Sequence, residues 1–181
     1  MAKKVFCMLL LFITGFVAAL FVGWWGFPKL LYSQKIQPIV FSHPVHVEGA
    51  GMTCDQCHFF REDGSFNGFP STKKCAECHE EALGDHPEEV KFVEQYINGG
   101  NYKEVPWYAY QKQPDNVYFS HAAHADIECT RCHLNVAAMD ELPAYQENKL
   151  TGYSRNTMKM WECERCHAEY GVSNACFVCH K

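Results

Sequence analysis

Five copies of the pattern Cys-x-x-Cys-His account for ten of the eleven cysteines and for half of the ten histidines. We number them motifs 1 to 5 in chain order: residues 54–58, 75–79, 129–133, 163–167 and 176–180. Their cysteines are Cys54, Cys57, Cys75, Cys78, Cys129, Cys132, Cys163, Cys166, Cys176 and Cys179, and their histidines are His58, His79, His133, His167 and His180. Residues i, i+3 and i+4 share one face of a helical turn, so two thiols can reach the two vinyl groups of one porphyrin while the histidine reaches its iron. The pattern is the attachment signature of c-type haem, and the sequence predicts five covalently bound haems.

Other uses of paired cysteines explain the pattern less well. Zinc sites also contain Cys-x-x-Cys pairs, but they need no histidine directly after every second cysteine. In thioredoxin-like redox proteins the Cys-x-x-Cys motif occurs once, near a βαβ pattern, and this sequence has no such pattern. Disulfides form outside the cytoplasm, but they would not explain five adjacent histidines. The cysteines therefore indicate a multihaem cytochrome c.

The histidines outside the motifs match the number of second ligands that such haems need. A haem that only transfers electrons has a ligand on each side of its iron, and the motif histidine supplies one of them. The remaining histidines are His43, His46, His86, His121 and His124. Methionine can take the same position, and Met139 and Met160 are the alternatives. Because this supply leaves no obvious vacancy on any iron, we expect electron transfer and no substrate turnover in this chain alone.

The part of the chain that carries the motifs contains an internal repeat. The sequence Phe-Ser-His-x-x-His begins at Phe41 and again at Phe119, 78 positions later, and each copy precedes two motifs. We therefore expect two related haem-pair units, residues 39–86 and 117–167, followed by an extra haem at motif 5. The predicted fold is a small, mostly irregular domain with short helices, in which porphyrins replace much of the apolar core.

Three shorter segments carry weaker signals. Residues 87–97 predict a helix, because Pro87 and two glutamates begin it and Asn-Gly-Gly at residues 98–100 ends it. The aromatic residues at 107–110 are expected to pack on haem faces, although they could line a quinone site. Residues 64–70 predict a turn-rich loop without a chemical role.

The N-terminus predicts a membrane anchor. Residues 5–27 are uncharged and would form a helix about 35 Å long, enough to cross a hydrocarbon core about 30 Å thick. Lys3 and Lys4 precede it, and Trp24 and Trp25 lie at its far end, as expected for a cytoplasmic N-terminus and an aromatic belt. A cleaved signal peptide is the alternative, but its apolar region is shorter and ends in small residues. We expect residues 1–29 to hold the cytoplasmic N-terminus and the transmembrane anchor of the inner membrane, and residues 30–181 to form the periplasmic haem domain.

Charge excludes one class of partner. The formal net charge is −5, whereas a nucleic-acid-binding domain has a basic patch and a high pI.

The motif combination resembles known families. Phe-Ser-His-x-x-His ahead of Cys-x-x-Cys-His resembles the class III cytochromes c of anaerobic bacteria. The further matching stretches are residues 37–43, 68–71, 105–107 and 117–121, Met139 after motif 3, and Met160-Trp161 before motif 4. Together with the anchor, they are similar to the membrane-anchored multihaem cytochrome c subunits of the menaquinone reductase complexes of sulfate reducers. The same stretches also resemble the related pentahaem subunit of alternative complex III.

This resemblance implies a fold, partners and a direction. It implies class III-like haem packing, a molybdopterin-oxidoreductase-like subunit, an iron-sulfur subunit and a polytopic quinone-binding membrane subunit. Reduced soluble periplasmic class III cytochrome would supply electrons for menaquinone reduction in anaerobic sulfate respiration. Such subunits are described with six haems, whereas this chain has five motifs and one spare cysteine, Cys7. Cys7 would lie near the cytoplasmic end of the anchor, where we expect an ordinary buried thiol.

Three other functions use similar parts. A menaquinol-oxidising subunit of the alternative complex III type would run electrons the opposite way, and a stand-alone membrane-anchored quinol dehydrogenase would also pass them outwards. Both directions fit the sequence, because haem potentials depend on burial and hydrogen bonding. A multihaem reductase would need an open iron position.

Overall fold

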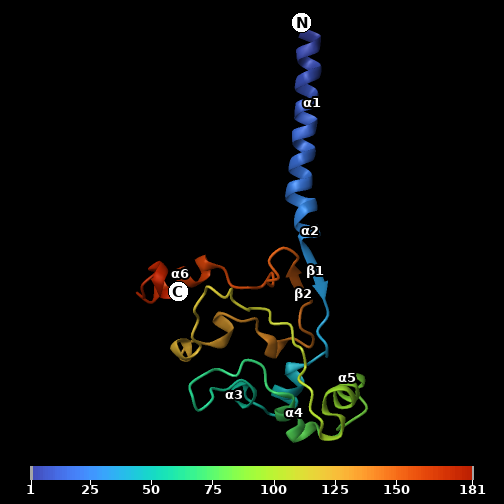
Figure 1. Cartoon of the computed structure of the whole chain (residues 1–181), viewed down its shortest axis with the longest axis vertical. Helices are drawn as coiled ribbons and strands as arrows, with labels where there is room; N and C mark the ends of the chain where they lie inside the picture. The colour runs from blue at the N-terminus through green and yellow to red at the C-terminus, as the bar shows by residue number, and fades with distance from the viewer. Residues whose placement is uncertain (1, 181) are drawn as a thin grey trace.

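A long N-terminal helix projects from a domain built of short elements. The computed structural model describes residues 2–180, and Figure 1 shows the helix rising away from the rest of the chain. It consists of α1 (Ala2–Phe21), a π-helical turn (Val22–Gly26) and α2 (Phe27–Leu31). In the described part of the chain, the stretch Lys3–Leu31 is the one helix long and apolar enough to cross a membrane.

The helix continues past the proline at which the sequence predicted its end. Within the π-helical turn the N–H of Phe27 donates to the carbonyl of Val22, one residue further back than in an α-helix. Pro28 has no N–H to donate and lies in the first turn of α2, so the altered register takes up the missing hydrogen bond. The ammonium of Lys29 lies 3.7 Å from the ring centroid of Trp25.

A two-stranded sheet joins this helix directly to the domain. Strand β1 (Tyr32–Lys35) pairs antiparallel with β2 (Tyr145–Asn148), in the register Tyr32 to Asn148 and Lys35 to Tyr145. The N–H of Lys149 also donates to the carbonyl of Leu31, the last residue of α2. The sequence does not predict these strands, because each has four residues and its partner is far away in the chain.

Most of the other elements are short helices or single helical turns, and each motif begins in one of them. The motif-bearing elements are α3 (Cys54–Cys57), α4 (Thr72–His79), a 3-10 turn (Cys129–Arg131), α6 (Met160–Glu169) and α7 (Cys176–Cys179). A π-helical turn (Val45–Gly49) and a 3-10 turn (Ala122–His124) follow the two Phe-Ser-His sequences, and a further 3-10 turn spans Val136–Ala138. The small, mostly irregular domain with short helices is confirmed.

The helix predicted at residues 87–97 is present, with a changed pitch. It comprises α5 (Pro87–Phe92) and a π-helical turn (Val93–Ile97), followed by a 3-10 turn (Asn98–Gly100). Asn98 has a φ of 40°, a left-handed conformation that ends the helix. Ile97 is fully buried, and around it lies the small apolar core formed by Ile39, Ala76, Phe92, Tyr96 and Val105.

The two halves of the domain lie at different distances from the anchor. In Figure 1, α3, α4 and α5 lie at the end of the molecule away from the long helix, whereas α6 and the C-terminus lie at the level of β1 and β2. Motifs 1 and 2 are therefore remote from the anchor, and motifs 4 and 5 lie closer to it.

Candidate haem sites

Each motif is shaped by the hydrogen bonds of its own helical turn. The N–H groups of His58, His133 and His180 donate to the carbonyls of the first cysteines of their motifs, at 2.8, 2.9 and 2.9 Å. These bonds close the turn that brings first cysteine and histidine to one face. None of the eleven cysteines, all of which the structure describes, forms a disulfide, so the ten motif sulfurs are available for thioether bonds.

Three motif histidines face a second imidazole across a gap of constant size. The ring centroids are 6.0 Å apart for His46 and His79, 6.3 Å for His121 and His133, and 6.2 Å for His124 and His167. Two imidazoles that bind one metal ion from opposite sides, each with its nitrogen about 2.0 Å from the metal, have ring centroids about 6 Å apart. The residues present therefore fit an iron between each pair.

His43 is the fourth upstream histidine of this kind, and its neighbour is His58. Burial lowers the pKa of His43 to about 4, and the nearby His58 and His46 add to the shift. Partial burial also lowers the pKa of His121, with His133 and His124 contributing. Burial thus favours the neutral form of both rings, which is the form that binds metal. The Nδ1 atom of His43 is buried without a hydrogen-bond partner.

The internal repeat predicted from the sequence is also a repeat in space. Phe41 meets His43 edge-on at 4.8 Å and 84° and stacks on His46 at 4.4 Å and 22°. Phe119 meets its own two histidines in the same way, at 4.8 Å and 89° for the first and 4.7 Å and 23° for the second. One phenylalanine in each unit therefore fixes the orientation of two candidate ligands.

The second histidine of each unit is oriented by a backbone carbonyl. The Nδ1 atom of His46 donates to the carbonyl of Ser42 at 2.9 Å, and that of His124 donates to the carbonyl of Ser120 at 2.8 Å. A proton held on Nδ1 leaves Nε2 as the free ligand atom, as is usual for histidines that bind metals.

The loop of residues 64–70, expected to have no chemical role, contacts two candidate ligands. The carbonyl of Gly68 accepts a hydrogen bond from His58 Nδ1 at 2.6 Å, and Asn67 donates to the carbonyl of Cys57. Phe66 stacks on His121 with ring centroids 4.3 Å apart. These contacts are made by a backbone carbonyl and by apolar stacking, so residue type gave no signal for them.

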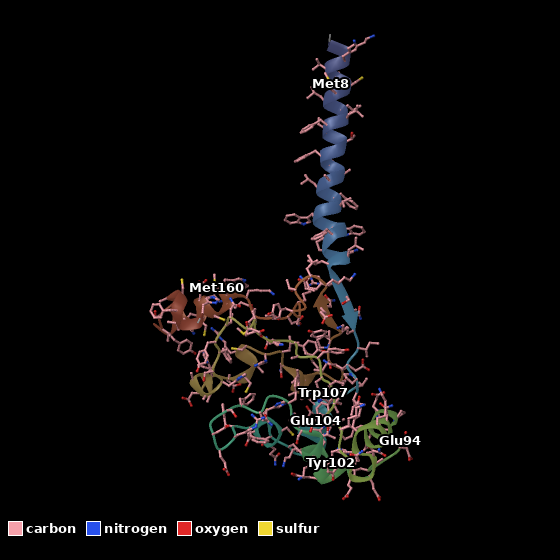
Figure 2. The ribbon with its side chains drawn as sticks, viewed as in Figure 1. Met8, Glu94, Tyr102, Glu104, Trp107 and Met160 are labelled. Atoms are coloured by element: carbon pink, nitrogen blue, oxygen red, sulfur yellow. The ribbon has the colours of Figure 1, made fainter. Side chains whose placement is uncertain are left out.

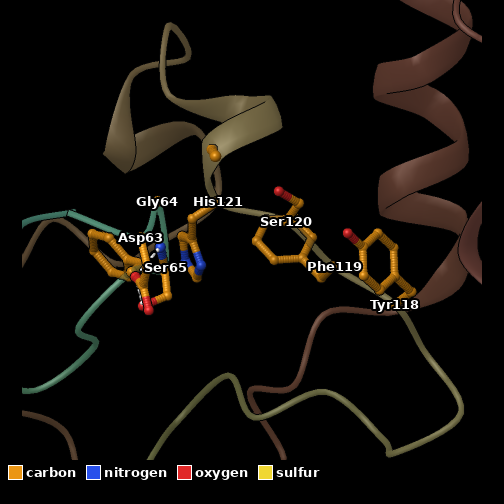
Figure 3. Close-up of a pocket in the computed structure, with 9 residues that line it drawn as sticks. Asp63, Gly64, Ser65, Tyr118, Phe119, Ser120 and His121 are labelled. Atoms are coloured by element: carbon orange, nitrogen blue, oxygen red, sulfur yellow. Dashed lines mark hydrogen bonds between the residues drawn. The ribbon is translucent and has the colours of Figure 1, made fainter. Parts of the chain in front are cut away.

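This loop also borders a cavity of about 440 Å³ between the two units. Figure 3 shows Gly64 and Ser65 of the loop, and Asp63 just before it, beside His121, with Phe119 and Tyr118 further along the opposite segment. One candidate ligand, His121, lines the cavity, and its other lining residues come from both units.

A carboxylate that the sequence analysis did not single out contacts motif 2. Glu89 Oε1 accepts a hydrogen bond from His79 Nδ1 at 2.8 Å and another from the N–H of Leu83 at 2.9 Å. The bond from Leu83 lowers the pKa of Glu89, and His79 contributes to the shift. A charged group therefore borders one motif histidine.

The other ligand candidates are dispersed. His86 is the exposed residue before α5, and Figure 1 shows α5 on the opposite side of the domain from the C-terminal motif. Met139 follows the turn at Val136–Ala138. Met160 begins α6 and is 65% exposed; Figure 2 labels it. His180 donates from Nδ1 to the carbonyl of Asn116 at 3.2 Å.

The aromatic segment after the first unit contacts the apolar core and the sheet. Trp107 packs against the apolar core, and the centroid of its ring lies 6.5 Å from that of Phe41. Tyr108 stacks on Tyr145 of β2 with ring centroids 5.0 Å apart. These contacts hold the segment between the core and the sheet.

The repeated Cys-x-x-Cys-His turns and the opposed imidazoles define the chain as a multihaem cytochrome c that transfers electrons. Residues 28–98 match the Class III cytochrome C family. The chain belongs to the family of the multihaem cytochrome c subunits of menaquinone reductase. It is 58% identical over 188 aligned residues to "Menaquinone reductase, multiheme cytochrome c subunit" of Nitratidesulfovibrio vulgaris (strain Hildenborough), an alignment that covers 94% of this chain and 89% of the relative.

Proposed function

We propose that this chain is the electron-relay subunit of a membrane-bound menaquinone reductase. The single observation that carries the proposal is the set of three imidazole pairs with centroids 6.0–6.3 Å apart, which leaves a metal-sized gap between each motif histidine and its partner. Haem c, when bound in such gaps, supplies one-electron storage. The chain's own residues attach, orient and space these groups and carry out no bond chemistry.

The proposed ligand pairs follow the repeat. His43 pairs with His58, His46 with His79, His121 with His133, and His124 with His167. The ten motif cysteines form the thioethers, which gives five haems by motif. His180 is the motif ligand of the fifth, and His86, Met139 and Met160 are the candidates for its second ligand or for the family's sixth haem.

The proposed order of the haems in space differs from their order in the chain. Each unit holds its two distal histidines one helical turn apart, so motif 1 neighbours motif 2 and motif 3 neighbours motif 4. Phe66 and Gly68 of one loop contact His121 and His58, which supports a step from motif 1 to motif 3. The side chain of Asn174 donates to the carbonyl of Glu164 in α6, which supports a step from motif 4 to motif 5. The resulting order is motifs 2, 1, 3, 4 and 5.

The position of the anchor suggests how this chain of haems is oriented. We propose that residues 1–29 comprise the anchor and that residues 30–181 form the domain on the periplasmic side. Motif 2 then faces away from the membrane, toward a soluble class III cytochrome. Motifs 4 and 5, at the level of the sheet beside the anchor (Figure 1), face the membrane and the other subunits.

The proposed direction is from reduced periplasmic class III cytochrome toward menaquinone. Its support is the relative's name, which specifies menaquinone reductase. We propose as partners a molybdopterin-oxidoreductase-like subunit, an iron-sulfur subunit and a polytopic quinone-binding subunit. Menaquinol oxidation with outward electron flow is the alternative, because the same haem arrangement conducts both ways.

The experiment is isolation of the native complex from membranes, followed by redox titration with both partners. We expect the three proposed subunits to co-purify, and we expect reduced class III cytochrome to reduce the haems, which a menaquinone analogue then oxidises. Haem reduction by menaquinol but not by the cytochrome would contradict the direction. Quinol oxidation by the isolated chain would instead identify a stand-alone dehydrogenase.

A further inference from the structure

One motif histidine differs from the other candidate ligands in what its second nitrogen contacts. Five histidine Nδ1 atoms within residues 2–180 make hydrogen bonds to protein groups, and four of the acceptors are backbone carbonyls. The fifth acceptor is the carboxylate of Glu89, 2.8 Å from His79 Nδ1. Motif 2 is therefore electrostatically distinct from its counterparts.

The contact is built into the fold on both sides. Glu89 lies in the first turn of α5, and its Oε1 atom is held from a second direction by the N–H of Leu83. The ring of Phe92 meets His79 edge-on at 6.3 Å and 89°. The side chains of His79 and Glu89 are 22% and 19% exposed, so water screens the interaction only partly.

A carboxylate at this atom changes the ligand more than a carbonyl does. A hydrogen bond to a carboxylate orients a metal-binding imidazole and raises its basicity. A more basic ligand and a nearby full negative charge both favour the oxidised, more positively charged iron over the reduced one. Outer hydrogen bonding is one of the protein's means of setting a haem potential.

We propose that Glu89 is a positioning residue that lowers the reduction potential of the haem held by His79 relative to the other haems of this chain. The proposal rests on His79 being an iron ligand, as the proposed function requires. It makes motif 2, at the end remote from the anchor, the most reducing position of the chain of haems. Electrons that enter there move to neighbours that accept them more readily.

The test is a redox titration of the holoprotein carrying Glu89→Gln, followed by optical and electron paramagnetic resonance spectroscopy. The amide keeps an oxygen that can accept from Leu83 and His79 but removes the charge. We expect the reduction equilibrium constant of one haem to rise about tenfold, a shift of about 59 mV for a one-electron couple. The low-spin resonance of that haem should move, and the resonances of the others should not.

The matched control is Glu88→Gln, which removes the same charge from the adjacent residue of α5. Glu88 accepts from the N–H of Val40 and pairs with Lys91. We expect this variant to leave all potentials near those of the parent protein. Equal shifts in the two variants would show an effect of overall charge, and unchanged potentials in Glu89→Gln would overturn the proposal.

The spectrum of His79→Ala separates this proposal from the haem assignment. A high-spin signal from one haem in His79→Ala, together with an unshifted titration in Glu89→Gln, would overturn the role of Glu89 and leave the relay function intact. Should Glu89→Gln fail to load its haems, Glu89→Asp gives the second reading. Aspartate keeps the charge but has a shorter side chain, which moves the carboxylate away from His79. We expect a smaller positive shift in the reduction potential of the same haem. An unchanged potential of that haem would overturn the proposal.

Discussion

Phe66 stacks on His121 with ring centroids 4.3 Å apart, although the two residues belong to different halves of the internal repeat. The loop that carries Phe66 also holds His58 through the carbonyl of Gly68. A single loop thus contacts a candidate ligand in each unit. We therefore expect the haems of the first and second units to form one electron path rather than two independent pairs.

We expect His121→Ala to open one iron without releasing its haem. The haem stays attached because Cys129 and Cys132 form its thioethers, but the lost imidazole leaves a vacant position. A high-spin signal from one haem per chain should appear in optical and electron paramagnetic resonance spectra. Ala123→Ser, an exposed change in the same turn, is the control, and a spectrum unchanged by His121→Ala would remove His121 from the ligand set.

The second ligand of the motif 5 haem is the position at which we expect an exception. A His/Met haem through Met139 or Met160 would have a sulfur-to-iron absorption band. Replacing the responsible methionine by leucine should remove that band, whereas His86→Ala should leave it. Loss of low-spin character in His86→Ala alone would assign the position to His86.

The haem content should be five per chain, or six if the family's additional haem is present. Denaturing, reducing haem assays and intact mass measure this directly, since the mass should exceed the 20.8 kDa polypeptide by that number of haems. The double variant Cys176→Ser/Cys179→Ser should lose one haem. Cys7→Ser should lose none, and a lost haem there would show that this thiol holds the sixth.

Ile97→Ala should lower the free energy of unfolding by about 2–5 kcal/mol. Ile97 is fully buried, so the truncated side chain would leave a cavity in the small core. Denaturant unfolding of the holoprotein measures this free energy. Ile36→Ala is the matched control, since Ile36 is 80% exposed and surface changes stay within about 0.5 kcal/mol. Equal losses in both variants would contradict the assignment of the core.

Protease treatment should find the haem domain outside the inner membrane. In spheroplasts, mild proteolysis should release haem-bearing fragments and leave the anchor in the membrane, because the haem domain would be exposed on that side. Inverted vesicles should protect the same fragments. The reverse result would overturn the proposed orientation.

Reduction of the complex by class III cytochrome should slow several-fold as salt rises. The chain has a formal net charge of about −7 when Lys3 and Lys4 are left out. A partner with a lysine-rich face is therefore attracted to it. Exposed charges beyond about 10 Å are screened at roughly 0.1 M salt. Stopped-flow measurements at several ionic strengths test this, and a rate independent of salt would indicate apolar docking or entry through another subunit.

Local geometry explains which parts of the haem sites can be predicted from the sequence. The motif cysteines and histidines are recognisable because i, i+3 and i+4 residues meet within one helical turn, whatever the rest of the chain does. The repeat at Phe41 and Phe119 and the helix from Pro87 were readable for the same reason. The long apolar segment before Pro28 needs only its length and composition.

Tertiary structure alone decided which residues meet across the domain. The opposition of His46 to His79, the stacking of Phe66 on His121 and the contact of Glu89 with His79 join separate segments through loops. The pairing of Tyr32 with Asn148 depends on a strand that lies more than a hundred residues away. Such contacts depend on packing and on loop closure, which no local periodicity encodes. The sequence by itself therefore determined the chemistry of each attachment turn, and the fold decided the partners, order and electrostatic surroundings of these turns.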